Sequence, residues 1–305
     1  MIQFIKQGRF LALMFMLLGC LAIQASDDLI TKQITIKLDK AGTLPDKIGS
    51  TKKYKITNLK IVGEINGTDW VFIRDMAGRG LKDYIYTNGK LSVLDLSEAK
   101  IVEGGDCYYY DVTKYYTSND RLGDYAFYGC CRLTSLSLPS GITSIEKSTF
   151  RGCSGLTSLV IPSSVTSILI SAFYGCSGLA SLVIPSNVTS IWESAFNGCS
   201  GLTSVYVSWQ TPLRITTSVF SHVDKTKCTL YVPQGASQDY WLADVWGDFE
   251  NIVEYDVTGI DNVATSTDAK EISRYSANGQ RLSAPTKGLN IVKYSDGSVK
   301  KVVVQ

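Results

Sequence analysis

Residues 149–168 read TFRGCSGLTSLVIPSSVTSI, and residues 172–191 read AFYGCSGLASLVIPSNVTSI. The same register continues on both sides, because a phenylalanine returns every 23 residues and, at the last step, after 24 residues. These phenylalanines are Phe127, Phe150, Phe173, Phe196 and Phe220. A cysteine stands three positions after each of the first four, at Cys130, Cys153, Cys176 and Cys199. Chance is a poor explanation for so regular a spacing, and we expect the repeat to organise the fold.

Aliphatic residues within each period follow the pattern L-x-x-L-x-L, as at Leu156, Leu159 and Ile161. A fixed period of roughly 20 to 29 residues with this pattern is typical of leucine-rich repeats. One such coil buries its apolar side only when it stacks on a neighbour. We therefore predict a leucine-rich repeat solenoid that is mostly β, with a parallel sheet on one face and short turns or helices on the other faces.

Alternation along the strand assigns a direction to each side chain of one coil. Leu159 and Ile161 are expected to point inward, whereas Ser158 and Val160 line the outer face of the sheet. Pro162 ends this strand, and a second short extended run follows at 165–168. Each coil is thus expected to contribute two short extended segments.

The repeated cysteines are predicted to form a ladder of buried thiols. Equivalent positions on neighbouring coils lie about 5 Å apart, but their side chains run parallel and do not face each other, which disfavours a bridge. Cys107, the Cys130–Cys131 pair and Cys228 are the remaining candidates for a disulfide, and the sequence does not choose among them. Zinc is not expected, because the chain has no CxxC pair.

Composition and motifs exclude several functional classes. The chain has 305 residues, with 30 basic side chains, 28 acidic side chains and one histidine, His222. It has no concentrated basic stripe, so we expect no nucleic-acid partner. It has no GxSxG, HExxH or phosphate-loop motif, and its acidic residues are too scattered to nominate a catalytic pair. We therefore predict a protein that is not an enzyme, with no catalytic residue, cofactor or metal.

Residues 1–25 have the outline of a signal peptide. Lys6 and Arg9 precede an apolar run at 10–23, and cleavage is expected near Ala25. The run is shorter than the roughly 20 apolar residues that span a membrane. The alternative is a lipoprotein box ending at Cys20, which would make this residue a lipidated first residue and the protein's attachment to a membrane. Both alternatives predict export, with the protein either secreted or displayed on the outer-membrane surface.

The end of the chain has a different pattern. Two tight-turn signals, Asn278-Gly279 and Asp296-Gly297, lie between extended runs and predict a small antiparallel β-module over 257–305. The stretch KGLNIVKYSDGSVKKVVV at 287–304 resembles, in shortened form, the carboxy-terminal sorting domains of type IX secretion in Bacteroidetes. A vestige of such a domain and a β-fragment of ordinary structural use are the alternatives.

The AFxGC copies, the LTSLxIP strands and the VTSI returns over 127–220 resemble the BspA-like family of leucine-rich repeat proteins, found on the surfaces of Bacteroidetes. The resemblance implies an amino-terminal cap, in which Ile56, Leu59 and Ile61 imitate a strand, and a segment that closes the other end. The repeat domain with its caps then covers 26–256, with an insertion at about 103–121. Adhesion or contact with a host is implied, without the identity of the ligand.

Positions that differ between copies are free of the packing demands of the coil, and several hold apolar residues. Leu169, Ile170, Tyr174 and Trp192 are apolar where other copies are polar, and we expect them to form a patch. Tyr206 lies on the outer face of its strand, at a position whose residue differs between copies. Such residues can dock a partner, unless the insertion or a cap covers them.

The insertion carries five tyrosines, at Tyr108, Tyr109, Tyr110, Tyr115 and Tyr116. Tyrosine offers a large rigid contact area and a hydroxyl, which suits recognition of proteins and carbohydrates. The alternative is that these rings pack onto the first coils. We predict a monomeric protein that binds a protein or glycan ligand on host or neighbouring cells. The alternative function is a structural scaffold of the envelope without a specific external ligand.

Overall fold

The computed structural model describes residues 29–82, 84–255, 271–276, 281–282, 284, 288–294 and 299–304. The predicted signal peptide at 1–25, with Cys20, lies outside the described residues, as do both predicted turns of the carboxy-terminal module. Over the described ranges, no helix has both the length and the apolar character needed to cross a membrane.

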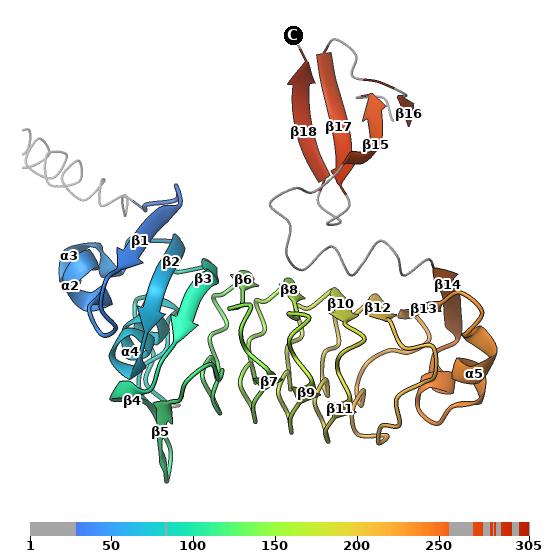
Figure 1. Cartoon of the computed structure of the whole chain (residues 1–305), viewed down its shortest axis with the longest axis horizontal. Coiled ribbons are helices and arrows are strands. Elements are labelled where there is room, and N and C mark those ends of the chain that lie inside the picture. The colour runs from blue at the N-terminus through green and yellow to red at the C-terminus, as the bar shows by residue number, and fades with distance from the viewer. Residues whose placement is uncertain are drawn as a thin grey trace, which may run out of the picture.

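A parallel sheet of nine strands runs along the repeat region and both caps (Figure 1). Each neighbouring pair is parallel, because each turn of the chain returns one coil further along. The strand order is β1 (Ile34–Leu38), β2 (Asn58–Ile65), β3 (Val93–Ile101), β6 (Ser135–Ser137), β8 (Ser158–Val160), β10 (Ser181–Ile184), β12 (Ser204–Val207), β13 (Thr229–Pro233) and β14 (Asn251–Tyr255). The predicted solenoid is confirmed.

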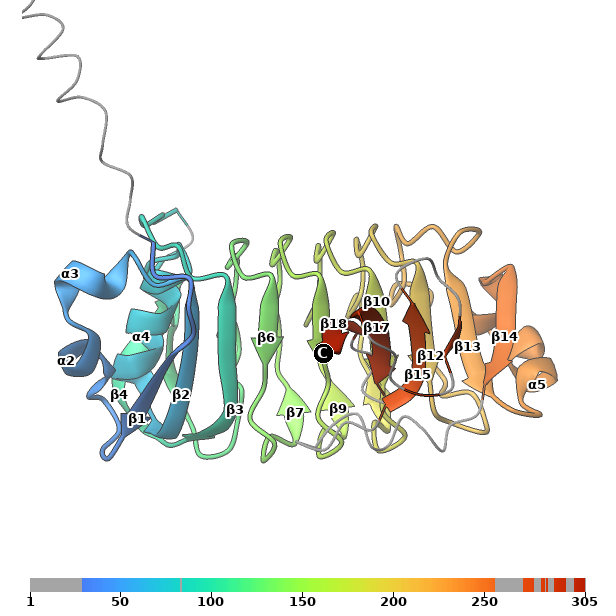
Figure 2. The ribbon, with the colours of Figure 1, turned by 90° about the horizontal axis from the view of Figure 1, so that it is seen from above.

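A second, smaller parallel sheet follows the same coils (Figure 2). Its strands are β7 (Ser144–Ile145), β9 (Ser167–Ile168) and β11 (Ser190–Ile191). In the coil at 149–168, Leu159 and Ile161 are buried, while Ser158 and Val160 are exposed. The predicted alternation and the second extended segment are therefore both confirmed.

The repeated phenylalanines form a continuous stack through the core. Successive ring centroids lie 5.1 to 5.4 Å apart, and successive planes are within 18° of parallel. All five rings are fully buried. Because a ring inside the stack covers a neighbour on each face, one coil completes its core only when the coils on both sides are present.

The repeated cysteines lie beside this stack as the predicted ladder of thiols. The Sγ–H of Cys153 donates to the carbonyl oxygen of Phe127 in the preceding coil, at 3.0 Å. The same bond recurs from Cys176 and from Cys199, at 3.1 and 3.2 Å. All seven cysteines in the described part of the chain are free, so none of the positions left open by the sequence forms a bridge there.

Hydroxyl side chains join the coils on the outside. Thr157 Oγ1 donates to the carbonyl oxygen of Thr134 in the preceding coil at 3.0 Å, and Thr203 Oγ1 donates to that of Ala180 at 3.1 Å. A short hydroxyl both faces water and satisfies a carbonyl oxygen of the neighbouring coil. This explains why the repeats use Ser and Thr on the outside and why the chain has few charged residues.

The amino-terminal cap covers the first coil. It contains β1 together with α2 (Leu44–Ile48), α3 (Ser50–Lys53) and α4 (Gly67–Met76). The Asp69 carboxylate accepts the N–H of Asn66 at 3.0 Å and that of Leu44 at 2.9 Å, which joins the start of α4 to the start of α2. The residues expected to imitate a strand are buried, at Ile56, Leu59 and Ile61. Leu59 and Ile61 lie in β2, whereas Ile56 lies two residues before this strand.

The opposite end is closed by β13, β14, α5 (Ser237–Leu242) and the short 3₁₀ helix η1 (Trp246–Asp248). Trp246 is fully buried, and its ring meets the last ring of the stack, Phe220, edge-on at 5.5 Å. Its Nε1 donates to the carbonyl oxygen of Leu213 at 2.7 Å. The indole thus covers the end of the phenylalanine stack and removes it from water.

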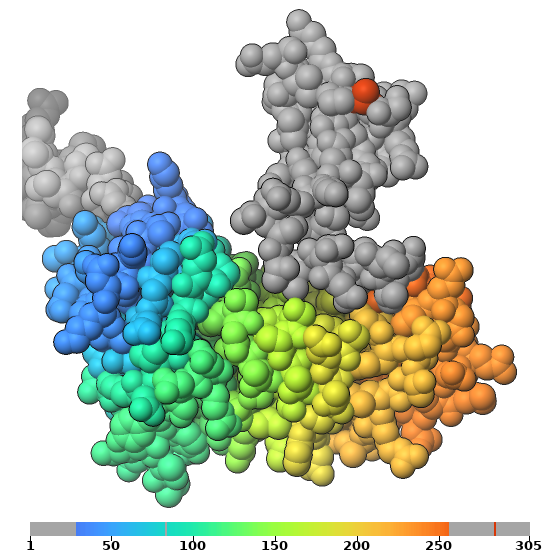
Figure 3. Space-filling view, viewed as in Figure 1, coloured from blue at the N-terminus to red at the C-terminus, as the bar shows by residue number. Residues whose placement is uncertain are grey.

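The insertion is a β-hairpin, whereas the sequence suggested a loop. β4 (Gly104–Tyr110) and β5 (Lys114–Thr117) pair antiparallel, and Val112 at their turn is 94% exposed. The hairpin lies beside α4 (Figure 1), where Thr68 Oγ1 donates to Asp106 Oδ2 at 2.9 Å. It projects from the lower left of the body in Figure 3.

The carboxy-terminal residues form a separate antiparallel sheet in the order β16-β15-β17-β18. Its strands are β15 (Glu271–Ser276), β16 (Arg281–Leu282), β17 (Gly288–Tyr294) and β18 (Val299–Val304). β15 pairs with β16, and β17 pairs with β18, as expected for hairpins at the two predicted turns. The antiparallel character of this segment is confirmed.

Candidate functional site

Two of the five insertion tyrosines belong to the core. The hydroxyl of Tyr108 donates to the carbonyl oxygen of Asp124 at 2.7 Å, and Tyr109 stacks on Tyr125 at 4.9 Å. Both residues are at most 2% exposed. Burial raises the pKa of Tyr108, so its hydroxyl keeps the proton that it donates. These two rings attach the hairpin to the first coil, and they are too buried to offer an exposed ring to a partner.

A buried arginine of α4 strengthens this attachment. Arg74 Nη1 donates to the carbonyl oxygens of Tyr125 and Ala126 at 3.0 and 2.9 Å. Its guanidinium also lies over the ring of Tyr109, 5.2 Å from the centroid. One face of the hairpin is therefore fixed to α4 and the first coil, and only its other face and its turn are open to a partner.

A tyrosine-rich surface forms where the hairpin meets a second loop. The N–H of Tyr110 donates to the carbonyl oxygen of Leu81 at 2.9 Å, which places the hairpin against the loop at 79–90. Lys82 Nζ lies 5.0 Å from the ring of Tyr110 and 5.7 Å from that of Tyr84. Tyr84 and Tyr86 are each 72% exposed. We call Lys82, Tyr84, Tyr86 and Tyr110 the tyrosine surface.

The sequence predictions above did not include the loop at 79–90. Its residues 81–86 read LKDYIY, and the exposed side chains of Tyr84, Ile85 and Tyr86 are unusual for so short a loop. The available signal was a cluster of aromatic and aliphatic residues between Gly80 and Gly89, outside any repeat. Apolar and aromatic residues at such a position suit a contact surface.

A small groove opens between the hairpin and the first two coils. Its volume is about 240 Å³, and we call it the hairpin groove. It is lined by Tyr108, Tyr115, Tyr116, Ser118, Arg121, Gly123, Asp124 and Glu146. Tyr115 is half-buried, and Tyr116 is 52% exposed at its rim. The groove therefore combines tyrosine side chains with two carboxylates and one guanidinium.

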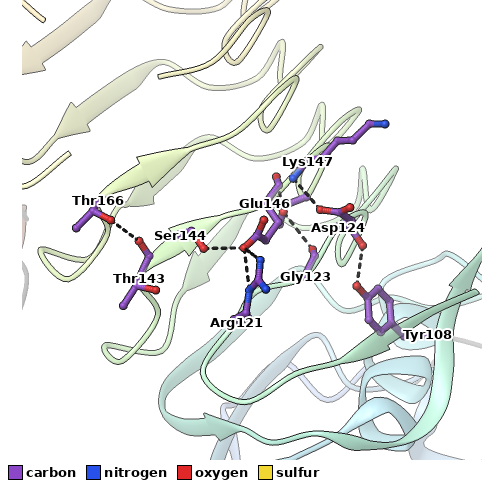
Figure 4. A network of polar contacts seen from close by, with 10 residues as sticks. Tyr108, Arg121, Gly123, Asp124, Thr143, Ser144, Glu146, Lys147 and Thr166 are labelled. Atoms are coloured by element: carbon purple, nitrogen blue, oxygen red, sulfur yellow. Dashed lines mark hydrogen bonds and ion pairs between the residues drawn. The ribbon is translucent and has the colours of Figure 1, made fainter. Parts of the chain in front are cut away.

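The charged side chains of the groove make two separate sets of hydrogen bonds (Figure 4). Arg121 donates from Nε and Nη2 to Glu146 Oε1, at 3.0 and 2.5 Å. Ser144 Oγ donates to the same oxygen at 2.7 Å. Asp124 Oδ1 accepts the backbone N–H of Lys147 at 3.0 Å. Burial, and next the charge of Glu146, raise the pKa of Asp124, whereas the hydrogen bond to Glu146 raises the pKa of Arg121.

The outer face of the large sheet carries a second candidate surface. Register aligns Val160, Val183, Tyr206 and Tyr231 on neighbouring strands in one outward row. The rings of Tyr206 and Tyr231 are stacked at 4.3 Å with an angle of 6° between their planes. Burial, and next the charge of Tyr231, raise the pKa of Tyr206, which stays protonated. Because the two rings cover each other, they present edges and hydroxyls to a partner.

The predicted apolar patch is partly exposed. Ile170 is 38% exposed and Trp192 is 51% exposed, so within the described residues neither the insertion nor a cap covers them. Leu169 and Tyr174 are half-buried, and the guanidinium of Arg151 lies 4.4 Å from the ring centroid of Tyr174. Leu169 and Trp192 occupy equivalent positions of neighbouring coils. Of the four residues in this prediction, only Ile170 and Trp192 are exposed, and a contact role for them stays a prediction.

Comparison with known proteins agrees with this architecture. The family model described as BspA type Leucine rich repeat region matches residues 120–234 in six copies. This range includes the repeats predicted over 127–220 and continues into the closing segment. No curated protein matches the chain.

Several solved structures are similar. The pneumococcal vaccine antigen PcpA is 17% identical with a TM-score of 0.37, and the match covers 67% of this chain and 57% of PcpA. A leucine-rich cell surface protein from Faecalibacterium prausnitzii is 18% identical with a TM-score of 0.31, covering 69% of this chain and 68% of that one. A leucine-rich repeat protein from Bacteroides ovatus is 14% identical with a TM-score of 0.28, covering 58% and 60%. The six matched copies lie on the coils described above and have the pattern of BspA-type leucine-rich repeats.

Proposed function

We propose that this protein is exported and acts by binding a protein or glycan ligand outside the cell, without catalysing a reaction. The observation that carries the proposal is the meeting of two segments distant in sequence at the tyrosine surface. Tyr84 and Tyr86 come from one loop and Tyr110 comes from the hairpin, and a cation lies between two of the rings. Rigid aromatic side chains with free edges lose little conformational entropy on binding.

The sheet face and the patch around Trp192 are secondary contact surfaces in this proposal. Both expose apolar or aromatic side chains on a rigid stack of coils, which suits a partner larger than a small molecule. The monomer offers these surfaces on one body, and a ligand that contacts more than one of them would gain affinity through each.

Binding is tested with an array of immobilised matrix proteins and glycans. The mature chain is compared with the triple variant Tyr84→Ser, Tyr86→Ser, Tyr110→Ser. Removing the hairpin would be a poor test, because Tyr108 and Tyr109 belong to the core. The matched control is Trp241→Ser with Leu242→Ser, which removes the exposed side chains of α5 at the opposite cap. We expect the triple variant to lose at least about tenfold in affinity and the control to bind as the parent does.

The array also separates the proposal from a scaffold of the envelope. A scaffold would bind no class of immobilised ligand, and that result would overturn the proposed function. Export is tested separately by mass spectrometry of the mature amino terminus. We propose that it begins at Ser26, and a lipidated Cys20 would instead establish a membrane anchor. Secretion through the type IX system is tested by deleting residues 257–305 and locating the product.

A further inference from the structure

We propose that the hairpin groove binds one positively charged side chain of a protein partner, either a lysine ammonium or an arginine guanidinium. The inference rests on the proposed function, because the groove lies on the same hairpin as Tyr110 of the tyrosine surface. It deepens that function by naming the chemistry of the ligand. It favours a protein with an exposed basic residue over a neutral glycan.

The size of the groove limits what can enter. About 240 Å³ accommodates the end of one side chain and no larger element of a partner. The groove is open along one side, where Tyr116 stands exposed at its rim. A long, flexible side chain that projects from a partner surface can reach into such a space while the backbone of the partner stays outside.

The charges that line the groove do not balance. Asp124 and Glu146 contribute two carboxylates, whereas Arg121 contributes the only guanidinium of the lining. Arg121 uses Nε and Nη2 on one oxygen of Glu146. Asp124 makes no ion pair within the described part of the chain, and its hydrogen bond comes from a backbone N–H. The lining therefore has one excess negative charge, which a single cation neutralises.

The charge of the neighbouring Lys147 lowers the pKa of Asp124 in part, but Lys147 makes no ion pair with this carboxylate in the described part of the chain. The amino group of Lys147 points away from both carboxylates (Figure 4) and lies 5.9 Å from the ring centroid of Tyr125. Burial, and next the charge of Glu146, disfavour the ionised form of Asp124 and raise its pKa. A cation from a partner would reverse that effect by pairing with the carboxylate.

Aromatic rings complete the chemistry. Tyr115 and Tyr116 stand in the lining beside the carboxylates, and cations are attracted to the faces of aromatic rings. The protein uses this contact elsewhere, since the guanidinium of Arg79 lies 4.4 Å from the ring centroid of Tyr86. A carboxylate next to tyrosine rings offers both an ion pair and a cation–π contact. A neutral saccharide would use the rings and hydrogen bonds but would gain nothing from the excess charge.

The experiment uses small probes and the intact mature chain at low salt. N-acetyl-arginine amide and N-acetyl-lysine amide are titrated while tyrosine ring signals are followed by NMR. N-acetyl-citrulline amide and maltose are the neutral comparisons. We expect the two cationic probes to cause saturable changes in chemical shift. Their affinity should fall as salt is added, because salt screens the charges. Equal binding of citrulline amide or maltose would overturn the proposal and point to neutral ligands.

A charge-removing variant locates the site. Asp124→Asn keeps the oxygen that accepts the Lys147 N–H and removes only the charge, so the fold should remain. We expect this variant to bind both cationic probes with an affinity lower by at least about tenfold. Asp111→Asn is the matched control, because Asp111 Oδ1 likewise accepts a backbone N–H, from Thr113 at 2.7 Å, but lies outside the groove lining. Identical affinities for the Asp124 variant and the parent would contradict the inference.

The two proposals fail in different ways. If the array finds a ligand whose retention is unaffected by Asp124→Asn and by free arginine amide, the groove inference is wrong and the binding function stands. If the array finds no ligand but arginine amide binds and depends on Asp124, the proposed function is wrong and the groove is still a site for a cation.

Discussion

The rings of Phe150 and Phe173, from neighbouring coils, stack with their centroids 5.1 Å apart and their planes 18° from parallel. The same arrangement links each later pair until Phe220 meets Trp246 of the carboxy-terminal cap edge-on. Stability therefore depends on contacts between coils, and removing one ring damages both neighbours.

Truncating one ring of the stack should lower stability strongly. For Phe173→Ala we expect a loss of about 3 to 5 kcal/mol in the free energy of unfolding, measured by urea titration. The adjacent Tyr174→Ala is the control, because Tyr174 is only half-buried and lies outside the stack. Equal losses for the two variants would show that the stack has no special role.

Two adjacent cysteines should differ sharply in reactivity. Cys130 is fully buried and Cys131 is exposed. Burial raises the pKa of Cys130 and raises that of Cys228 to about 11, so both remain protonated at pH 8. Under native conditions we expect a maleimide to label Cys131 first, as measured by mass spectrometry of peptides. Rapid native labelling of Cys130 would contradict the ladder.

Alkaline pH should destabilise the fold through its thiols. Burial raises the pKa of Cys153 well above its ordinary value, so the folded state binds this proton more tightly than the unfolded state does. The stabilisation is complete below about pH 8 and is lost as the pH rises, by about 1.4 kcal/mol per pH unit for each such thiol once the unfolded thiol ionises.

The matched variant for this effect is Cys153→Ala. We measure its free energy of unfolding in urea between pH 8 and 10. This free energy should fall less steeply with pH than that of the parent, and the difference in slope should approach the release of about one proton, or about 1.4 kcal/mol per pH unit. The comparison cancels the titration of tyrosines and lysines, which both proteins share. Parallel slopes would show that Cys153 is not protected from ionisation in the folded state.

The buried Arg74 should hold the hairpin against the first coil. Arg74→Met removes the donors for the carbonyl oxygens of Tyr125 and Ala126, and we expect a loss of about 3 kcal/mol. We also expect faster cleavage by a protease at the hairpin turn near Val112. Arg132→Met removes an exposed arginine and is the control. Unchanged cleavage in the Arg74 variant would mean that Tyr108 and Tyr109 hold the hairpin without it.

The candidate site was only partly accessible to sequence reasoning. The tyrosine cluster of the insertion identified Tyr110 and Tyr116, which reach the surface, but also Tyr108 and Tyr109, which do not. All four stand in one short stretch, and nothing local separates them. Their fates differ because α4 and the first coil pack against one face of the hairpin, and those partners lie far away in the sequence.

The sequence by itself determined the coil, because one period repeats the same inward positions and each copy stacks on a similar neighbour. The directions of Leu159 and Ile161, the free thiols and the second extended segment all follow from that local symmetry. Tertiary structure decided the surfaces. The approach of the loop at 79–90 to Tyr110 depends on how the unrepeated insertion packs, and no periodicity encodes it.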